Sequence, residues 1–375
     1  MKRNNINSET QLDLVCFSHL RWDFVYQRPQ HLLTRCARER RVFFVEEPVF
    51  GSGSMRLEIN EREGGVQVVV PHLPDGLRSE VATTAVLKEM VRRVLTENGV
   101  REYVFWYYTP MALTFTDDLE PVAAVYDCMD ELSAFKGANS RLRDLERSLF
   151  QQVDLVFTGG QTLYEAKRTQ HPAVYAFPSS IDATHFGKAR TTTVDPDDQA
   201  SIPHPRLGFF GVIDERFDID LLSEVAIQRP DWQFVMIGPV VKIDPESLPQ
   251  HANIHYLGPK KYDELPAYLS GWDIALLPFA RNESTRFISP TKTPEYLAGG
   301  CPVVSTAIRD VVRTYGDSGV VRIAGTADEF AAAIDAALED AKDRDRLLRT
   351  ADAVLSDMSW DKTWNEMKEK IECAL

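Results

Sequence analysis

DIALLPFARNESTRFISPTKTPEYLAGGCPVVST, at residues 273–306, is the stretch of this chain that decides its fold. The run Ile274–Leu277 predicts a buried strand that ends at a proline, and a long polar loop follows it. A short helix is expected next, ending at Gly299-Gly300, and then a second apolar strand at residues 302–305. In an open α/β sheet, ligands bind in the loops that follow the strand ends, so the segment predicts a binding site.

The predicted helix begins with a cation. If Thr291 is the N-cap, Lys292 is the first helical residue and Pro294 the third, where a missing N–H removes no helical bond. A lysine there opposes the helix dipole, but with the free N–H groups around it the lysine suits a bound phosphate. The alternative is that Lys292 extends into solvent or pairs with Glu295. Hydroxyls, a lysine and a carboxylate in one loop are groups that suit a phosphorylated sugar nucleotide.

Length and composition predict a soluble globular protein of two domains. The chain has 375 residues, of which 44% are hydrophobic and 26% charged. No apolar run approaches the roughly 20 residues of a membrane span. The N-terminal sequence MKRNNINSETQ has no apolar core, so we expect no signal peptide.

Cysteine usage predicts a reducing, cytoplasmic environment. The five cysteines are scattered, with no CxxC pair, at positions 16, 36, 128, 301 and 373. This spacing is typical neither of a disulfide framework nor of a zinc site.

The charge distribution disfavours nucleic acid as a partner, because the net charge is −14. Residues 1–190 hold 23 Lys and Arg against 25 Asp and Glu, whereas residues 191–375 hold 19 against 31. The first half contains two basic clusters: Arg35, Arg38, Arg40 and Arg41, then Arg141, Arg143 and Arg147. They predict contact with an anionic membrane surface or a lipid diphosphate, or else are ordinary solvated helix faces.

Strand-like and helix-like segments alternate along the chain, which indicates parallel sheets with crossover helices. The predicted strands are residues 12–18, 42–46, 66–70, 103–108, 122–127, 155–158, 174–177, 207–212, 233–237, 254–257, 274–277, 302–305 and 320–323. The polar stretch before Leu207 has no periodicity and predicts a linker. We expect an N-terminal Rossmann-like domain at 1–187, a linker at 188–205, a C-terminal Rossmann-like domain at 206–356 and a final helix at 357–375.

Several common sites are excluded by their missing motifs. No GxGxxG follows a strand, and no Walker A sequence, GxSxG or HExxH is present. The Asp218-Ile219-Asp220 string opens a predicted helix and is interpreted as N-terminal capping.

Four segments together resemble bacterial glycosyltransferases of the two-Rossmann-domain GT-B type, family 4-like (group 1). They are HLRWDFVYQRPQHLLTRCARERRVFFVEE (19–47), VYDCMDELSAFKG (125–137), FFGVIDERFDIDLL (209–222) and SPTKTPEYLAGGCPVVST (289–306). The chain looks closest to the teichuronic acid and exopolysaccharide branch. The resemblance implies an α/β fold with two Rossmann-like domains facing a cleft, and a C-terminal helix that crosses back to the N-terminal domain.

In that family the donor nucleotide binds the C-terminal domain, and Glu295 matches the glutamate that holds the ribose. Phe287 stands where the family carries a second glutamate, and Val212 stands where it carries an arginine. Arg216 lies near the position of the family's lysine, so one of the two cations is approximately kept. Lys292 is predicted to supply the positive charge that is missing at Val212. The resemblance implies these donor-binding residues: Gly211, Arg216, Gly238, Lys261, Tyr262, Thr285, Ser289, Thr291, Lys292 and Glu295.

For the acceptor side, the resemblance favours Asp130 as the catalytic base, with Asp127 second and His19 third. A carboxylate at a strand end can deprotonate a hydroxyl that it reaches. Asp127 can equally be a structural cap, and His19 a packing residue. Trp22 and Arg28 are expected to line the acceptor side, with Arg28 as an anion contact.

The resemblance thus implies a hexosyltransferase that moves a sugar from a UDP-sugar to a saccharide or lipid-linked saccharide in cell-surface polysaccharide synthesis, with retention of configuration. We expect no cofactor, no metal, and a cytoplasmic location with peripheral contact at the membrane. Two alternatives are a nucleotide-sugar epimerase or hydrolase on the same fold, and a non-catalytic saccharide-binding scaffold.

Overall fold

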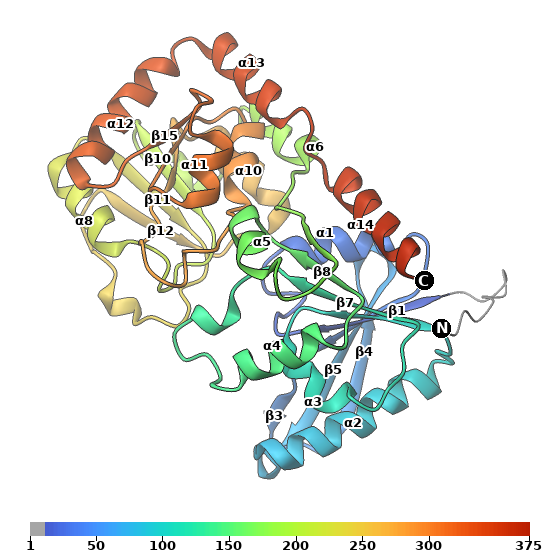
Figure 1. The fold of residues 1–375 in the computed structure, drawn as a ribbon. Helices are drawn as coiled ribbons and strands as arrows, with labels where there is room; N and C mark the ends of the chain where they lie inside the picture. The colour runs from blue at the N-terminus through green and yellow to red at the C-terminus, as the bar shows by residue number, and fades with distance from the viewer. Residues whose placement is uncertain (1–11) are drawn as a thin grey trace.

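Two separate β-sheets organise the computed structural model, which describes residues 12–375 (Figure 1). The segment on which the signal-peptide expectation rests, residues 1–11, lies outside the described residues. We call the part built on the first sheet the N-terminal half and the part built on the second the C-terminal half.

The N-terminal sheet has the strand order β3-β5-β2-β1-β6-β7-β8-β9, with β4 paired to β5. Only the β4–β5 pair is antiparallel. The bounds are β1 Asp13–Ser18, β2 Val42–Glu46, β3 Val49–Gly51, β4 Arg56–Glu61, β5 Val66–Pro74, β6 Tyr103–Tyr107, β7 Ala123–Cys128, β8 Leu155–Thr158 and β9 Val174–Ala176.

The C-terminal sheet is parallel throughout, in the order β12-β11-β10-β13-β14-β15. The bounds are β10 Arg206–Phe210, β11 Gln233–Ile237, β12 Ile254–Gly258, β13 Ile274–Leu277, β14 Val303–Ser305 and β15 Val321–Ile323. In each sheet the first strand, β1 or β10, lies between the second and a later one. The strand order therefore reverses beside β1 and beside β10, and ligands bind at such switch points in open sheets.

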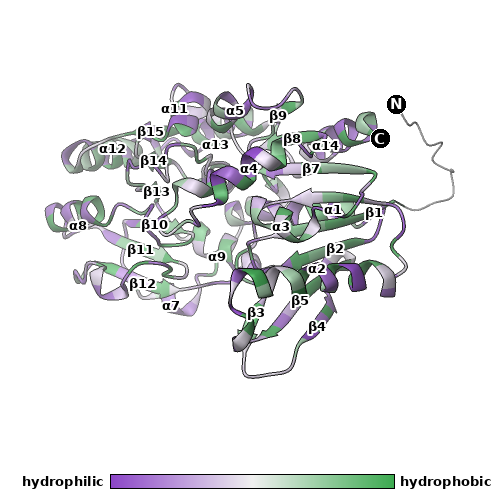
Figure 2. Ribbon diagram, turned by 60° about the horizontal axis from the view of Figure 1, so that its bottom comes forward, coloured by the Kyte–Doolittle hydropathy of each residue, from purple (hydrophilic) through white to green (hydrophobic). Residues whose placement is uncertain are grey.

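Helices cover both faces of the sheets. They are α1 Arg28–Cys36, α2 Glu80–Glu97, α3 Leu113–Thr116, α4 Leu142–Phe150, α5 Gln161–Lys167, α6 Ala183–Gly187, α7 Asp197–Ala200, α8 Ile219–Gln228, α9 Leu265–Ser270, α10 Lys292–Ala298, α11 Arg309–Tyr315, α12 Ala327–Asp340, α13 Arg344–Leu355 and α14 Trp360–Ala374. With both faces covered, strands are apolar runs, and all five residues of β6 (YVFWY) are buried. Figure 2 shows this hydrophobic colouring along the strands.

The C-terminal helix α14 returns to the N-terminal half and packs beside α1, as Figure 1 shows. Its buried residues Trp360, Trp364, Met367 and Ile371 repeat at helical spacing and join the core on one face of the N-terminal sheet. The Trp360 ring stacks on His31 of α1 with centroids 4.6 Å apart. The predicted GT-B arrangement, with a final helix that crosses back, is therefore confirmed.

Residues 188–205 contain a short 3-10 helix at Lys188–Arg190 and the helix α7. Gln199 of α7 is fully buried: its amide donates to the Tyr268 carbonyl and its oxygen accepts from the Trp272 indole. This segment consequently packs against the C-terminal half.

Candidate active site

The ends of strands from both halves meet across one cleft. His19 follows β1 and Asp130 follows β7 in the N-terminal half, while Gly211 follows β10 and Phe279 follows β13 in the C-terminal half. Three adjoining cavities run along this cleft and share lining residues. The two switch points of the fold thus open into one continuous space.

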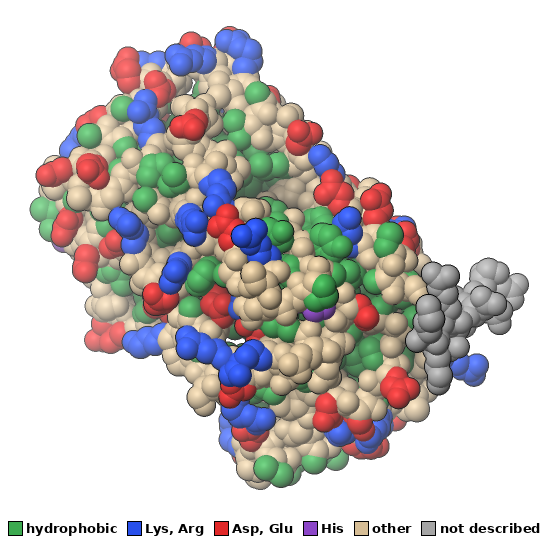
Figure 3. Space-filling view, viewed as in Figure 1, with side chains coloured by type: hydrophobic (Ala, Val, Ile, Leu, Met, Phe, Trp, Pro, Cys, Tyr) green, Lys and Arg blue, Asp and Glu red, His purple; other side chains and the backbone are tan. Residues whose placement is uncertain are grey.

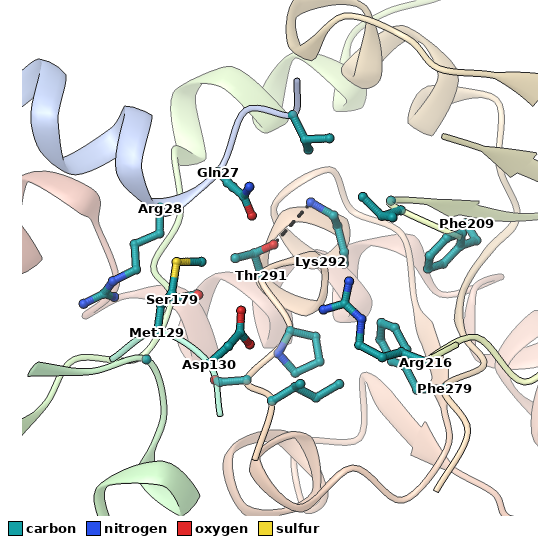
Figure 4. A pocket seen from close by; sticks show the side chains of 17 residues that line it. Gln27, Arg28, Met129, Asp130, Ser179, Phe209, Arg216, Phe279, Thr291 and Lys292 are labelled. Carbon is teal, nitrogen blue, oxygen red and sulfur yellow. Dashed lines mark hydrogen bonds between the residues drawn. The ribbon is translucent and has the colours of Figure 1, made fainter. Parts of the chain in front are cut away.

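The middle space, here called the central cavity, has a volume of about 140 Å³. Figure 4 shows Asp130 from the N-terminal half pointing into it, with Arg216 and Lys292 from the C-terminal half. The expected donor residues that line it are Gly211, Arg216, Ser289, Thr291 and Lys292. Gln27 and Met129, which belong to the segments 19–47 and 125–137 but were not chosen as site residues, also line it, as does Ser179.

Two larger hollows flank the central cavity. The Lys261 hollow, of about 500 Å³, is lined by Gly238, Lys261 and Tyr262 but also by Trp22 of the N-terminal half. The His19 hollow, of about 470 Å³, is lined by His19, Asp130 and Arg216. Trp22, expected on the acceptor side, therefore lies with the donor candidates.

Two glycines at the ends of β10 and β11 make room for the cleft. Gly211 has φ 153° and Gly238 has φ 142°, values that favour glycine. A Cβ at Gly238 would lie 1.8 Å from the Gly211 carbonyl oxygen, so no side chain fits there. The end of β11 can approach the end of β10 this closely only because Gly238 has no side chain.

Lys292 opens α10 with Thr291 as the N-cap, which confirms the predicted register. Its Nζ lies 3.1 Å from Glu295 Oε2 and donates to the Thr291 hydroxyl at 3.2 Å. Glu295 is only 5% exposed, and burial raises the pKa of its carboxyl group while Lys292 opposes the rise. The pairing of Lys292 with Glu295, one of the alternatives, is thus present, and Lys292 also lines both the central cavity and the Lys261 hollow.

Arg216 is held in place by a side chain that sequence reasoning missed. Its guanidinium forms a two-pronged pair with Asp214, with Nε–Oδ1 at 2.9 Å and Nη2–Oδ2 at 2.7 Å. Such pairs fix geometry as well as charge. Asp214 lies two residues before Arg216 in the same loop, so the spacing D-x-R was the available signal.

Asp130 faces this pair across the cleft. The surrounding protein desolvates the carboxyl group and raises its pKa to about 6, while Arg216 pulls the pKa down and Asp214 pushes it up. An acid with a pKa near the working pH is suited to exchange a proton with a hydroxyl.

Asp127, the second base candidate, is fully buried and engaged elsewhere. Its carboxylate accepts from Arg28 Nε at 2.9 Å and from Arg28 Nη2 at 2.9 Å. Arg28, only 1% exposed, also donates to the Phe177 carbonyl at 2.7 Å, and Figure 4 shows its guanidinium directed away from Asp130 and Lys292. Although Arg28 touches the central cavity, its charge is neutralised inside the N-terminal half.

His19 is neutral at ordinary pH, because burial lowers its pKa to about 4. Its Nδ1 has no hydrogen-bond partner among residues 12–375. The imidazole can therefore accept a hydrogen bond from a ligand hydroxyl.

Three further predicted or noted residues have structural contacts. Tyr262 lies between Tyr26 and His185, with ring centroids 4.3 and 4.1 Å away, so both of its faces are covered. The Thr285 hydroxyl donates to the Ala280 carbonyl and orders its own loop, away from the cavities. Phe287, which replaces the expected glutamate, packs against the core of the N-terminal half. The loop thereby gives up a carboxylate and gains a contact between the halves.

Within residues 12–375, no group of three or more His, Cys, Asp and Glu is arranged to hold a metal ion. No helix in that part of the chain combines the length and apolar character needed to cross a bilayer. The cysteines in the same range are free, and four of them are buried.

Comparison with known proteins finds a family match in the C-terminal half. Residues 204–340 match the family model "Glycosyl transferases group 1". The chain is also 34% identical over 229 residues to the Bacillus subtilis (strain 168) protein TuaH, whose name assigns it provisionally to teichuronic acid biosynthesis as a glycosyltransferase. That match covers 56% of this chain and 56% of the relative, so the chain spans little more than half the length of TuaH.

Solved structures show that the likeness in fold extends over nearly the whole chain. Sucrose-phosphate synthase from Thermosynechococcus elongatus superposes with a TM-score of 0.74 at 13% identity, covering 96% of this chain and 98% of the other. Anabaena HepE, solved in complex with UDP and glucose, superposes with a TM-score of 0.69 at 13% identity, covering 96% and 100%. Residues 204–340 therefore match the group 1 glycosyltransferase model, in a chain that has the GT-B fold.

Proposed function

We propose that this protein is a glycosyltransferase that moves a sugar from a nucleotide-diphosphate donor, a UDP-sugar, to a hydroxyl of a saccharide. The observation that carries the proposal is the central cavity, where Asp130 from one half faces Arg216 and Lys292 from the other. A base and two cations across a cleft are the groups that this transfer needs.

The donor fits the C-terminal half. Lys292 lines both the central cavity and the Lys261 hollow, so a diphosphate between them would meet its ammonium group. Glu295, whose carboxylate borders Lys292, would accept hydrogen bonds from the ribose diol. UDP is favoured because HepE, which has the same fold, binds UDP and glucose.

In the proposed reaction the acceptor oxygen bonds to the anomeric carbon on the same face from which the diphosphate leaves, as the bond from that carbon to the diphosphate breaks, so the configuration is retained. Asp130 takes the acceptor proton, and Arg216 and Lys292 stabilise the negative charge that gathers on the leaving diphosphate. We propose that these two cations stabilise the leaving diphosphate without a resident metal. The family resemblance predicts retention of configuration at the anomeric carbon. The anomeric coupling constant of the product, measured by NMR, checks the stereochemistry.

The wider assignment is to cell-surface polysaccharide synthesis in the cytoplasm, with a lipid-linked acceptor and peripheral membrane contact. It rests on the resemblance and on the name of TuaH. The first basic cluster is largely neutralised within the protein, because Arg35 and Arg38 both pair with Asp361 and Arg41 pairs with Asp13. Co-sedimentation with anionic vesicles, before and after reversal of the Arg40 charge, tests the contact.

A thermal-shift screen of UDP-, GDP-, dTDP- and ADP-sugars tests the core of the proposal. A UDP-sugar should raise Tm selectively, since a ligand that binds only the folded state stabilises it. Assays with the selected donor then separate the alternatives. UDP release that needs no acceptor indicates a hydrolase, an altered donor sugar indicates an epimerase, and binding without turnover indicates a scaffold.

A further inference from the structure

The His19 hollow is lined by two lysines that form no ion pair within residues 12–375, together with the carboxylates of Glu47 and Asp130. Burial raises the pKa of the Glu47 carboxyl group while Arg21 and Lys242 oppose the rise, so the Lys242 charge acts on a neighbouring acid without an ion pair. The charged residues that line the hollow are Arg21, Lys136, Arg216, Lys242, Glu47, Asp130 and Asp214. Arg21 pairs with Glu46 at 2.8 Å and Arg216 pairs with Asp214 at 2.7 Å. Lys136 and Lys242 form no ion pair with any residue of the described chain, 12–375.

Lys242 is held by an unfavourable backbone. Its φ is 61°, and within residues 12–375 no other residue except glycines has a positive φ. This conformation costs a non-glycine residue about 1–2 kcal/mol and is retained where the surrounding structure fixes it, often at binding sites. Here it places the Lys242 Nζ 5.4 Å from the centre of the Phe135 ring.

The Phe135 ring contacts two cations of the C-terminal half. The Arg216 guanidinium lies 5.3 Å from the centre of the same ring. The next residue, Lys136, has its backbone N–H bound to Glu215 Oε1 at 2.9 Å, which fixes the loop against the C-terminal half. Lys136, Arg216 and Lys242 are thus brought to one wall of the His19 hollow by contacts between the halves.

We propose that the His19 hollow binds the acidic group of a saccharide acceptor, a carboxylate or a phosphate, with Lys136 and Lys242 as its cationic ligands. The inference rests on the proposed transferase function and names the class of its acceptor. A chain with net charge −14 repels anions at long range, so an acidic substrate needs local cations such as these. His19 lines the same hollow, and its Nδ1 is buried without a hydrogen-bond partner among residues 12–375.

The test uses the full chain loaded with UDP and three probes: glucose, glucuronic acid and glucose 6-phosphate. Their affinities are measured by NMR titration at low and high salt. The acids should bind at least roughly tenfold tighter than glucose, because hydrogen bonds to charged groups are the stronger ones, and salt should reduce the difference. Whichever acid binds tighter distinguishes a carboxylate acceptor from a phosphate acceptor.

The variant Lys136→Ala/Lys242→Gly should abolish the preference for acids. Glycine adopts φ 61° without strain, so Lys242→Gly removes the charge and does not disturb the backbone. The matched control is Lys342→Ala, an exposed lysine of the C-terminal half that pairs with Glu339 and should keep the preference.

Three results would overturn the inference. They are equal affinity for glucose and the acids, no detectable binding of either acid, and an unchanged preference for acids in the double variant. If UDP still raises Tm in those cases, the donor site stands and only the acceptor class is wrong. If UDP itself fails to stabilise the protein, the proposed function fails first.

Discussion

Asp127 and Asp130 lie three residues apart, and their surroundings give them different roles. Asp127 is fully buried and accepts three hydrogen bonds from Arg28, so its charge stabilises the contact of α1 with β7. Asp130 faces the cavity without a hydrogen-bonded cation, and desolvation raises its pKa to about 6. The first is a structural ion pair, and the second is available for proton transfer.

Asp130→Asn should lower the transfer rate by roughly 10²–10⁴-fold, the usual contribution of a general base. The Tm increase with UDP should stay unchanged, since the substitution leaves the donor residues intact. Asp127→Asn is the matched comparison: it should cost about 3–5 kcal/mol of folding free energy, because Arg28 stays buried without its partner. Full turnover in Asp130→Asn would show that the base is another group.

The pH dependence of stability gives an independent check on Asp130. Its pKa is about 6 in the folded protein and 3.8 in a model compound, so the folded state binds the proton more tightly. The group therefore stabilises the protein below pH 4, and this contribution is lost as pH rises through 6. Asp130→Asn should be more stable than wild type at pH 8, by on the order of 2–3 kcal/mol. Urea melts at pH 4 and pH 8 measure the difference, and equal gains at both values would argue against it.

Glu295 and Lys292 should control the affinity for UDP. Glu295→Gln keeps the size of the buried side chain but weakens its acceptor strength toward the ribose, so Kd should rise roughly tenfold. Calorimetric titration with UDP measures this. Glu283→Gln is the control, since this exposed loop glutamate makes only a 3.9 Å contact with Arg286. If Kd for UDP rose more in Glu283→Gln than in Glu295→Gln, Glu283 of the loop would be the residue that binds the ribose.

The residue types of the site could be read from the sequence, whereas their pairing could not. Lys292, Asp130 and His19 were selected as candidates and line the cleft. The fate of Asp127 depends on Arg28, which is 99 residues away, and no local pattern reveals such a pair. Lys242 and Phe135 were missed for the same reason, because their contact forms only between the two halves.

At the scale of elements, apolar strands were predictable, whereas two short or mostly exposed strands beside β5 were not. Every predicted strand is present within a few residues of its expected bounds, because burial on both faces leaves long apolar runs. The strands β3 and β4 were missed. β4 reads RLEINE, with side chains that are mostly exposed, and its alternation of Leu57 and Ile59 with charged residues was the available signal.

The ends of β10 and β11 should be intolerant of side chains. Gly238→Ala would place a Cβ 1.8 Å from the Gly211 carbonyl oxygen at φ 142°, so it should destabilise the protein by more than about 3 kcal/mol and weaken UDP binding. Gly258→Ala, at the end of β12, is the matched control. Its φ is 69° but nothing lies within 4 Å of the added Cβ, so only about 1–2 kcal/mol should be lost. Urea melts compare the two, and equal losses would contradict the close approach.

On the scale of the whole molecule, the site exists only while the two halves are together. Each half contributes a switch point. Figure 3 shows acidic and basic side chains mixed over the outer face that it draws. The halves are joined by specific contacts, among them the Tyr26–Tyr262 stack and the packing of Phe287 on the N-terminal core. Closure and site assembly are therefore one event.

The contact between α5 and α11 should set the closed population. Asp310 of α11 is 4% exposed, and its carboxylate accepts from the Thr162 backbone N–H at 3.0 Å and from the Thr162 hydroxyl. Asp310→Asn replaces one carboxylate oxygen, an acceptor, by an NH₂ donor next to the Thr162 backbone N–H and hydroxyl. Hydrogen bonds to a charged group contribute about 1.5–3 kcal/mol each, so the contact should weaken. The radius of gyration of the UDP-free protein, from solution scattering, should increase. The apparent Kd for UDP should rise, because only the closed fraction presents the complete site.

Glu165→Gln separates this buried contact from the surface pairs beside it. Glu165 of α5 pairs with Arg309 and Arg313 of α11, but all three side chains are at least one-third exposed. Exposed pairs contribute little, about 0–1 kcal/mol, so this variant should scatter like wild type and bind UDP almost unchanged. If Glu165→Gln opened the molecule more than Asp310→Asn, the surface charges would be the element that holds the halves together. If neither variant changed the radius of gyration, closure would depend on other contacts between the halves, among them the Tyr26–Tyr262 stack, α14 and the cations against Phe135.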